Sequence, residues 1–437
     1  MQRYEKYKDS GIEWLGEIPE HWEDRKLGNI LRPYSIKNRA DLPLLSITRE
    51  KGVIQRGEDP EEDNHNFIPD DLSGYKHLKI GQFGMNKMKA WQGSYGYSHF
   101  EGIVSPAYYI FDISSKLFGE YFSKTIRSKA YIPFFAKASD GVRIGQWDLS
   151  KQRMKEIPFY VPPLNEQEAI NKFLDDKCEK IDAAVNLKEQ QIEKLKELRQ
   201  ITIHNAVTQG IPHSNDEGAK MKDSGIGWIG KIPQHWEVRR LASLGFFSKG
   251  GGFSKADLVE EDGEPAILYG DIYTKYNYKI LSPIRLISRE ASSQAVKLDR
   301  NDLLFTGSGE LKEDIGKCVA FKSRLTTFAG GDVIIFKQRK NSSEYLSFCM
   351  NTNGAKYEKA KSSKGEIIVH TYASKLREIY IPIPPYHEQK EIVAYLEEQT
   401  SKIDKAIAQK QEQIIKLKEY KQSLINEVVT GKLKVTE

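Results

Sequence analysis

A fifteen-residue segment occurs twice in this chain, and this duplication constrains the fold more than any other feature. Residues 8–22 read KDSGIEWLGEIPEHW and residues 222–236 read KDSGIGWIGKIPQHW, with eleven of the fifteen positions identical. A second pair of similar segments lies further along, at residues 155–200 and 377–422. Each copy therefore has a shared head, a divergent middle and a shared tail. Because one copy spans roughly 200 residues, the pattern indicates a duplicated domain rather than the short repeat of a solenoid.

The two tails are predicted to be long helices. Within each tail a Pro-Pro pair precedes the predicted helix, and acidic residues follow within its first turn, where they suit the positive end of a helix dipole. Apolar residues then recur with the heptad spacing of helices that pack against each other. The predicted contact positions are Leu174, Cys178, Ile181, Val185, Lys188, Ile192, Leu195 and Arg199 in the first tail, and Leu396, Thr400, Ile403, Ile407, Lys410, Ile414, Leu417 and Lys421 in the second.

Two lysines, Lys188 and Lys410, interrupt this apolar seam at matched positions. A polar residue in such a seam can fix the register of a helix pair. A lysine can equally extend its ammonium group from the seam into water. Both interpretations stay open on the sequence alone.

The two middles are predicted to be compact α/β domains of roughly 150 residues each. Short apolar or β-branched runs, bounded by Gly, Pro, Asn or Asp, are typical of strands joined by loops. Examples are LPLLSI, GIVSPAYYIF, PAILYGDIY, NDLLFTGSG and GDVIIFK. A helical pattern, KLFGEYFSKTIRSKAY, lies between such runs.

Composition indicates a globular protein of the cytoplasm. The chain is 39% hydrophobic and 29% charged, and it has three scattered cysteines. Neither a disulfide framework nor a Cys/His zinc site is expected from that cysteine spacing. We expect no membrane partner, because the N-terminal segment is polar and there is no apolar run of about 18 residues.

The placement of charge points to a polyanion partner. The net charge is only +5, but residues 72–100 and 315–331 contain lysine or arginine and no acidic residue. Local basic surfaces on a nearly neutral chain are typical of proteins that bind nucleic acid at defined places.

Catalytic signatures do not emerge from the sequence. There is no phosphate-binding GxxxxGK[ST] loop, GxGxxG fingerprint or HExxH motif. The IPPY segment at residues 383–386 is similar to the Asn/Asp-Pro-Pro-Tyr/Phe loop of amino-methyltransferases. Its duplicate reads VPPL and both copies lack the polar first residue, so we interpret the pair as the start of the helical tails.

Candidate DNA contacts fall in the middles, where the two copies differ. Residues 75–100 interleave lysines with aromatic and amide side chains, which suits phosphate contact and base reading. Residues 269–279 are the aromatic-rich counterpart, and basic loops lie at residues 137–144 and 359–366. The candidates are Lys76, Lys79, Lys87, Lys89, Gln92, Ser94, Tyr95 and Arg143 in the first copy, and Tyr273, Lys275, Lys279, Ser308, Lys361 and Lys364 in the second. The alternative for each is an ordinary solvated loop or strand face.

Four tryptophans lie in the two heads: Trp14, Trp22, Trp228 and Trp236. Stacking on bases is one conceivable role for them. The heads are nearly identical, however, whereas surfaces that read different sequences should differ. We therefore predict that these tryptophans pack the heads.

The paired DSGIxWxGxIPxHW heads, the paired proline segments before the helical tails and the divergent middles together resemble the specificity subunit of type I restriction-modification systems. The resemblance covers nearly the whole chain. It implies an α/β (α+β) protein with two target recognition domains, separated by two long antiparallel helices that form a coiled-coil-like spacer, with pseudo-twofold internal duplication. The implied division is a first recognition domain at 1–160, a central helical region at 161–210, a linker at 211–221, a second recognition domain at 222–382 and a C-terminal helical region at 383–437.

The resemblance also implies a function. Each recognition domain would read one half of a bipartite, asymmetric site in double-stranded DNA, and the chain itself would not be an enzyme. Its partners would be two modification (methyltransferase) subunits and the restriction subunits. S-adenosylmethionine would be bound by the modification subunits and ATP with Mg by the restriction subunits, and no cofactor by this chain.

Two alternatives remain from the residues themselves. The chain could be a standalone DNA-modifying or DNA-cleaving enzyme whose site carries no recognisable motif. It could also be a coiled-coil scaffold that binds only proteins, which the heptads permit and the basic, aromatic-rich middles argue against.

Overall fold

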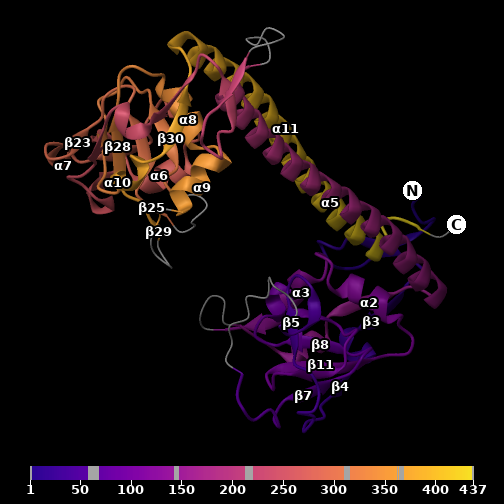
Figure 1. The fold of residues 1–437 in the computed structure, drawn as a ribbon. Coiled ribbons are helices and arrows are strands. Elements are labelled where there is room, and N and C mark those ends of the chain that lie inside the picture. The colour runs from indigo at the N-terminus through magenta and orange to yellow at the C-terminus, as the bar shows by residue number, and fades with distance from the viewer. Residues whose placement is uncertain are drawn as a thin grey trace. The chain divides into compact units, whose positions relative to one another are not determined.

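The computed structural model describes residues 2–57, 68–141, 147–211, 220–309, 315–361, 363 and 369–435 (Figure 1). The chain forms two compact units, one made of Met1–Glu189 with Gln411–Glu437 and the other of Gln190–Lys410. Each unit holds one head, one middle and part of both long helices. No helix in the described ranges is long and apolar enough to cross a membrane.

Each head is a short antiparallel hairpin. In the first unit β1 (Tyr7–Asp9) pairs with β2 (Glu17–Pro19), and in the second β15 (Met221–Asp223) pairs with β16 (Lys231–Pro233). The repeated Asp-Ser-Gly makes the same turn in both: the aspartate accepts a 2.9 Å hydrogen bond from the glycine N–H two residues on. That glycine has a φ of 70° in the first head and 71° in the second, a backbone conformation that favours glycine.

The His-Trp pair that ends each head is bound to the first turn of a long helix. Trp22 donates from Nε1 to Glu166 at 3.1 Å, and His21 Nε2 lies 2.8 Å from the same carboxylate. In the second unit Trp236 and His235 bind Glu388 in the same way, at 2.8 and 2.7 Å. In each unit the His-Trp pair of the head and the glutamate of the tail therefore bind each other, which explains why both motifs are repeated.

The head tryptophans pack as predicted. Trp22 and Trp236 are 1% and 0% exposed. Trp14 is half-buried and donates from Nε1 to the Ala130 carbonyl, and Trp228 is also half-buried. The repeated segment is thus architectural.

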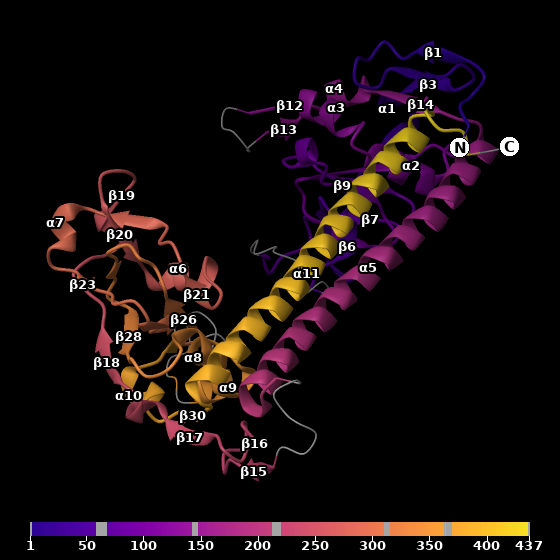
Figure 2. The ribbon, with the colours of Figure 1, turned by 90° about the horizontal axis from the view of Figure 1, so that it is seen from above.

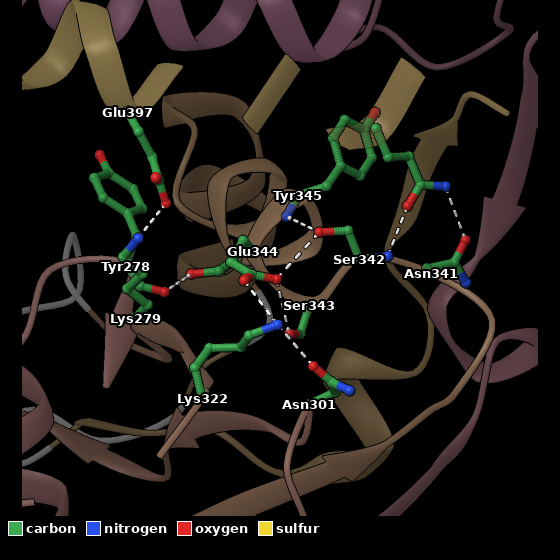
Figure 3. Close-up of polar contacts among 12 residues, drawn as sticks. Tyr278, Lys279, Asn301, Lys322, Asn341, Ser342, Ser343, Glu344, Tyr345 and Glu397 are labelled. Atoms are coloured by element: carbon green, nitrogen blue, oxygen red, sulfur yellow. Dashed lines mark hydrogen bonds and ion pairs between the residues drawn. The ribbon is translucent and has the colours of Figure 1, made fainter. Parts of the chain in front are cut away.

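A glutamine follows the glutamate in each tail and ties the long helix to the middle. Gln389 accepts a 2.8 Å bond from the Ser342 N–H and donates to the Pro384 carbonyl at 2.9 Å. In the first unit Gln167 accepts from the Phe118 N–H and donates to the Pro162 carbonyl at the same two distances. Figure 3 shows Ser342 and Asn341 at this contact, at the start of α8 (Ser343–Met350).

We expect Gln389→Leu to lower the free energy of unfolding by about 1–3 kcal/mol, because a buried N–H and a buried carbonyl would lose their partners. Urea denaturation followed by circular dichroism measures the change. The control is Gln234→Leu, at an exposed position, for which we expect a change within about 0.5 kcal/mol. Equal effects for the two variants would contradict a stabilising role for the repeated glutamine.

The long helices are α5 (Leu164–Gln209) and α11 (Tyr386–Val429). Every predicted contact position of the heptads is buried or half-buried, so the predicted seam is confirmed. In both units segments of α5 and α11 lie side by side (Figure 2).

Each unit contains the same ion pair between α5 and α11. In the first unit Lys421 binds Asp182 at 2.6 Å, and in the second Arg199 binds Asp404 at 3.2 Å. The two aspartates occupy matched positions of the tails. The second unit adds a 2.6 Å hydrogen bond from Lys410 to Gln191. In the first unit Lys418 also pairs with Glu189, so in each unit the residue numbers fall along α11 as they rise along α5, and the helices run antiparallel.

The Lys410 bond crosses the helix pair, which favours the register interpretation for that lysine. Lys188 at the matched position is half-buried.

The first middle has a four-stranded antiparallel sheet in the order β4-β11-β8-β9. A second layer contains the hairpin β5–β6 and the pair β7–β10, joined by a parallel bridge between Leu44 and Ile103. The strands are β4 (Leu31–Tyr34), β5 (Leu45–Thr48), β6 (Gly52–Gln55), β7 (Lys76–Leu78), β8 (Phe83–Asn86), β9 (Tyr95–Tyr97), β10 (Gly102–Val104) and β11 (Tyr108–Ile113). Helices α2 (Gly119–Ile126), α3 (Ile132–Lys137) and α4 (Lys151–Lys155) follow, with the short pair β12 (Ser139–Asp140) and β13 (Asp148–Leu149) between α3 and α4.

The second middle has two five-stranded sheets. The first runs β18-β28-β24-β26-β21 and the second runs β19-β22-β20-β27-β23. The strands are β18 (Phe246–Lys249), β19 (Leu258–Val259), β20 (Glu264–Ile267), β21 (Lys279–Ile280), β22 (Arg285–Ile287), β23 (Val296–Lys297), β24 (Leu303–Thr306), β26 (Cys318–Phe321), β27 (Phe328–Ala329) and β28 (Val333–Lys337). A short pair, β25 (Ser308–Gly309) with β29 (Val369–His370), lies outside them, and the helices are α6 (Tyr269–Thr274), α7 (Arg289–Ser292), α8, α9 (Asn353–Lys361) and α10 (Ala373–Leu376).

The two middles share one topology although their sequences differ. The order β4-β11-β8-β9 matches β18-β28-β24-β26, with antiparallel pairing throughout. The parallel bridge of the first middle matches the parallel pairing of β20 with β27. Strand β21 has no counterpart among the described strands of the first unit. The duplication therefore extends through the segments that the sequence comparison left unmatched.

Strand pairs β3–β14 and β17–β30 close each middle against its tail. They join β3 (Glu23–Lys26) to β14 (Pro158–Val161) and β17 (Glu237–Arg240) to β30 (Tyr380–Ile383). The segments just before the long helices are thus strands, as their apolar character predicts.

Candidate nucleic-acid interface

Four lysines of the first unit lie close enough to interact by charge, and two of them lie near the ring of Tyr109 on β11. Lys151 Nζ lies 4.2 Å from the centre of the Tyr109 ring, and Lys76 Nζ lies 6.0 Å from it. Lys37, Lys87 and Lys151 are close enough to Lys76 to disfavour its positive charge. We call Lys37, Lys76, Lys87 and Lys151 the lysine cluster.

Lys76 shows the effect of this crowding. Its side chain is half-buried and donates a 2.6 Å hydrogen bond to the Tyr108 carbonyl. Burial, followed by repulsion from Lys151, Lys37 and Lys87, lowers the pKa of Lys76 below its ordinary value. A bound polyanion would relieve the repulsion, because phosphate oxygens neutralise ammonium groups. The lysine cluster is therefore a candidate phosphate-binding surface.

Lys87 also has a partner of its own. Its Nζ lies 2.8 Å from Asp148 on β13, and this hydrogen bond raises the pKa of Lys87. Both side chains are partly exposed, at 30% and 56%. The positive charge of Lys87 is thus partly neutralised by Asp148, unlike that of the other members of the lysine cluster, which have no carboxylate partner among the ion pairs of the described residues.

Three other predicted residues of the first unit lie at or near the surface. Lys79 is exposed, with its Nζ 4.9 Å from the centre of the Tyr34 ring. Lys89 is exposed and, with Asn86, helps to line a cavity of about 280 Å³. Gln92 is half-buried. Their contact with DNA stays a prediction.

Ser94 and Tyr95 lie in the interior, at 3% and 0% exposure. The Tyr95 ring packs 4.4 Å from Phe135 and 5.8 Å from Phe83 between ring centres, and burial raises the pKa of its phenol. Buried side chains cannot meet a duplex at the surface. The structure therefore places both residues in the core instead of at the predicted interface, because Phe135 of α3 and Phe83 of β8 enclose the Tyr95 ring.

Arg143 and Lys364 fall outside the described residues. The structure thus bears on neither prediction.

In the second unit the predicted residues are spread over several elements. Lys275 is exposed at the end of α6, and Lys361 is exposed at the end of α9. Tyr273 is half-buried and its hydroxyl accepts a 2.8 Å hydrogen bond from Thr306. Lys279 forms an ion pair with Glu397 of α11 (Figure 3).

This last contact has an equivalent in the first unit. Lys124 on α2 binds Asp175 of α5 at 2.8 Å, and Asp175 and Glu397 occupy matched positions of the tails. Lys279 therefore serves to hold its middle against a long helix, which leaves its ammonium group already neutralised.

Lys275 and Lys279 line a groove of about 640 Å³ in the second unit. Its basic residues also include Arg199 and Lys405, but Glu344, Glu397 and Asp404 line it as well. Mixed charge suits a polyanion less well than the lysine cluster of the first unit does.

Ser308 on β25 is only 6% exposed, and its hydroxyl lies 3.0 Å from Nδ1 of His370 on β29. His370 is half-buried. The residue of this pair that reaches the surface is thus the histidine, which the sequence analysis did not single out.

Lys37, Lys151, Tyr109 and His370 are the residues that sequence reasoning missed. The first three are far apart along the chain: Lys37 follows β4, Tyr109 lies on β11 and Lys151 begins α4, so they come together only in the folded unit. His370 had a usable signal, because it aligns with Asp148 next to a basic loop of the repeat and differs from it in chemistry.

Among the described residues, no three His, Cys, Asp or Glu side chains are grouped as ligands of a metal ion would be.

A family model described as the type I restriction modification DNA specificity domain matches residues 117–197 and 233–418. These ranges cover more than half of the chain and include parts of both middles and both tails.

Two curated proteins of Methanocaldococcus jannaschii are similar to this chain. One, named as the MjaX specificity subunit of a type I restriction enzyme, is 24% identical over 447 residues, covering 96% of each chain. The other, the type I restriction enzyme MjaVIII specificity subunit, is 24% identical over 306 residues, covering 66% of this chain and 64% of that protein.

Two solved structures share the fold. A chain from a structure concerning complex assembly and conformational transition of the type I R-M system superposes with a TM-score of 0.69 at 14% identity, covering 95% of this chain and 99% of that one. The HsdS subunit from Thermoanaerobacter tengcongensis gives 0.53 at 16% identity, covering 95% and 98%. The architecture of mixed α/β domains and long helices predicted from the sequence is therefore confirmed.

Proposed function

Since this chain belongs to the type I restriction-modification DNA specificity family, we propose that its two units each read one half of a bipartite, asymmetric site in double-stranded DNA. The observation that carries this proposal is the shared strand order of the two middles combined with unlike side chains at matched places. Recognition of two different half-sites requires two different reading surfaces, and here one scaffold occurs twice with different side chains.

The lysine cluster supports DNA as the partner of the first unit. Phosphate contacts supply most of the sequence-independent affinity of DNA-binding proteins, and clustered ammonium groups are suited to them. Tyr109, next to two of these lysines, and Asn86, which directly precedes Lys87 in the chain, are half-buried side chains that can approach base edges.

The long helices are proposed to bind the modification subunits. Leu198 on α5 and Tyr420 on α11 occupy matched positions of the tails, and both are exposed, at 48% and 52%. Large exposed apolar side chains on a helix are typical of a protein interface. Two matched surfaces favour two copies of one partner, with restriction subunits joining that assembly.

Catalysis in this assembly is assigned to the partners. In the proposal the modification subunits bind S-adenosylmethionine and the restriction subunits bind ATP and Mg, while this chain supplies specificity and no catalytic group.

The test is an exchange of one middle. We expect that replacing residues 237–382 by the corresponding segment of a relative, in cells that carry the modification subunits, changes one half of the methylated site and leaves the other half unchanged. Genome-wide mapping of methylated adenines measures this. Methylation that is independent of the chain, or a change in both halves of the site, would contradict the proposal.

A further inference from the structure

In both units the main chain makes the same contact at the end of the matched strands β8 and β24. The N–H of Leu149 donates to the carbonyl of Lys87 at 2.9 Å, and the N–H of Thr371 donates to the carbonyl of Gly307 at 2.9 Å. Lys87 and Gly307 directly follow the two matched strands. We call this contact the junction.

The side chains at the junction differ between the units. In the first unit Asp148, the residue before Leu149, binds Lys87 at 2.8 Å. In the second unit His370, the residue before Thr371, binds Ser308 at 3.0 Å. The backbone is thus conserved between the copies while the chemistry has changed, which is the pattern expected of a position that determines specificity.

The second junction holds His370 in a defined orientation. Ser308 is buried and binds the Nδ1 atom, so the ring cannot turn freely. The strand under it is closely packed, because a Cβ on Gly309 would come within 2.5 Å of the Tyr273 hydroxyl. Residues fixed by neighbouring contacts are those that recognise a ligand with precision.

The other ring nitrogen of His370, Nε2, has a hydrogen-bonding capacity of its own. Within the part of the chain that the structure describes, Nε2 makes no hydrogen bond, and the residue is half-buried. If the Ser308 hydroxyl donates to Nδ1, then Nε2 carries the proton and donates; if Nδ1 donates to Ser308, then Nε2 accepts. Either form can bind a base edge in the major groove, where each base pair shows a distinct pattern of donors and acceptors.

The first junction lies beside the lysine cluster, since Lys87 belongs to both. Phosphates held by Lys37, Lys76 and Lys151 would bring a duplex to this place. The carboxylate of Asp148 can accept from the amino group of cytosine or adenine, and Lys87 can donate to guanine.

We propose that the junction is the base-reading position of each unit: His370, oriented by Ser308, reads one base pair in one half-site, and the Lys87–Asp148 pair reads one in the other. This inference rests on the proposed function. Ser308 is a positioning residue, whereas His370 contacts the base.

The test uses the full chain assembled with its modification subunits and a library of duplexes of randomised sequence. We expect His370→Gln to change the selected site at one base pair of one half-site, with discrimination there reduced by roughly 5- to 150-fold. Ser308→Ala should keep the same preferred base with weaker discrimination. Asp148→Asn should alter only the other half-site.

The matched control is His387→Gln, because His387 is an exposed histidine of the same unit on α11. This variant should select the wild-type site. Melting temperature and affinity for the randomised pool show whether each variant is folded, and His370→Asn provides a second substitution if Gln disturbs the fold.

The outcomes separate the two proposals. A wild-type protein that selects no sequence would contradict the proposed function. A wild-type protein that selects a bipartite site, with folded His370 variants that select the same site equally strongly or lose both halves, would overturn the junction as the reading position while leaving the proposed function standing.

Discussion

Replacing Lys37, Lys76 and Lys151 together by alanine is expected to weaken binding to every DNA sequence by up to about 100-fold at about 0.2 M salt. None of these three lysines has a carboxylate partner among the ion pairs of the described residues. Lys151 and Lys76 lie near the Tyr109 ring, and Lys37 and Lys151 both repel the charge of Lys76. Each lysine–phosphate contact contributes about 0.9 to the slope of log K against log salt, so losing three should reduce the slope by about 2.7.

The measurement is a titration of labelled duplex with the assembled protein at several salt concentrations. The selected sequence should stay the same, because phosphate contacts position the protein and carry no base information. A matched variant replaces three other exposed lysines of the first unit, Lys116, Lys129 and Lys172, by alanine. If both variants changed the slope equally, the lysine cluster would have no special role and only net charge would matter.

Trp236→Ala is expected to lower the free energy of unfolding by about 3–5 kcal/mol, which is the usual effect of removing a fully buried aromatic ring. The Trp236 side chain is 0% exposed and packs in the core that joins the second head to α5 and α11. Removing the indole also removes the 2.8 Å hydrogen bond that Glu388 accepts from the Trp236 N–H. A loss of this size is a large fraction of the free energy of unfolding of an ordinary domain.

Trp236→Phe separates packing from hydrogen bonding, since phenylalanine fills most of the space but has no N–H to donate. We expect a loss of about 1–3 kcal/mol for that variant. Urea denaturation gives the total change, and hydrogen exchange shows whether amides of the second unit lose protection first. Trp228→Ala, at a half-buried position of the same head, should cost less. If Trp228→Ala and Trp236→Ala were equally damaging, burial would not explain the role of the repeated tryptophan.

Much of the fold could be predicted because its signals are local. The heptad pattern identified both long helices, and every position that it predicted to lie at their contact is buried or half-buried, since a helix repeats its contacts at fixed spacing. The repeated Asp-Ser-Gly and His-Trp segments identified both heads. Strand order was not accessible in this way, because which strands pair depends on contacts between residues far apart in the chain.

The candidate site was predicted only in part for the same reason. Lys76 and Lys87 were identified, but Lys37, which follows β4, and Lys151, at the start of α4, join them only in the folded unit. Tyr95 lies in a basic, aromatic-rich segment that predicted DNA contact, yet Phe83 and Phe135 enclose its ring. Whether a side chain reaches solvent depends on what covers it, and neighbours in sequence do not decide that.

The duplicated unit, the two long helices and the two unlike middles can all be recognised from the amino-acid sequence, because repetition and periodicity are properties of the chain. The shared strand order of the middles and their common junction become visible only in the folded protein. Hydrogen bonds between strands are made by the backbone, which tolerates exchange of side chains, so a topology can persist after sequence similarity is lost. Side chains on that backbone are free to diverge. Those proposed to distinguish one DNA sequence from another are Lys87 and Asp148 in one unit and Ser308 and His370 in the other.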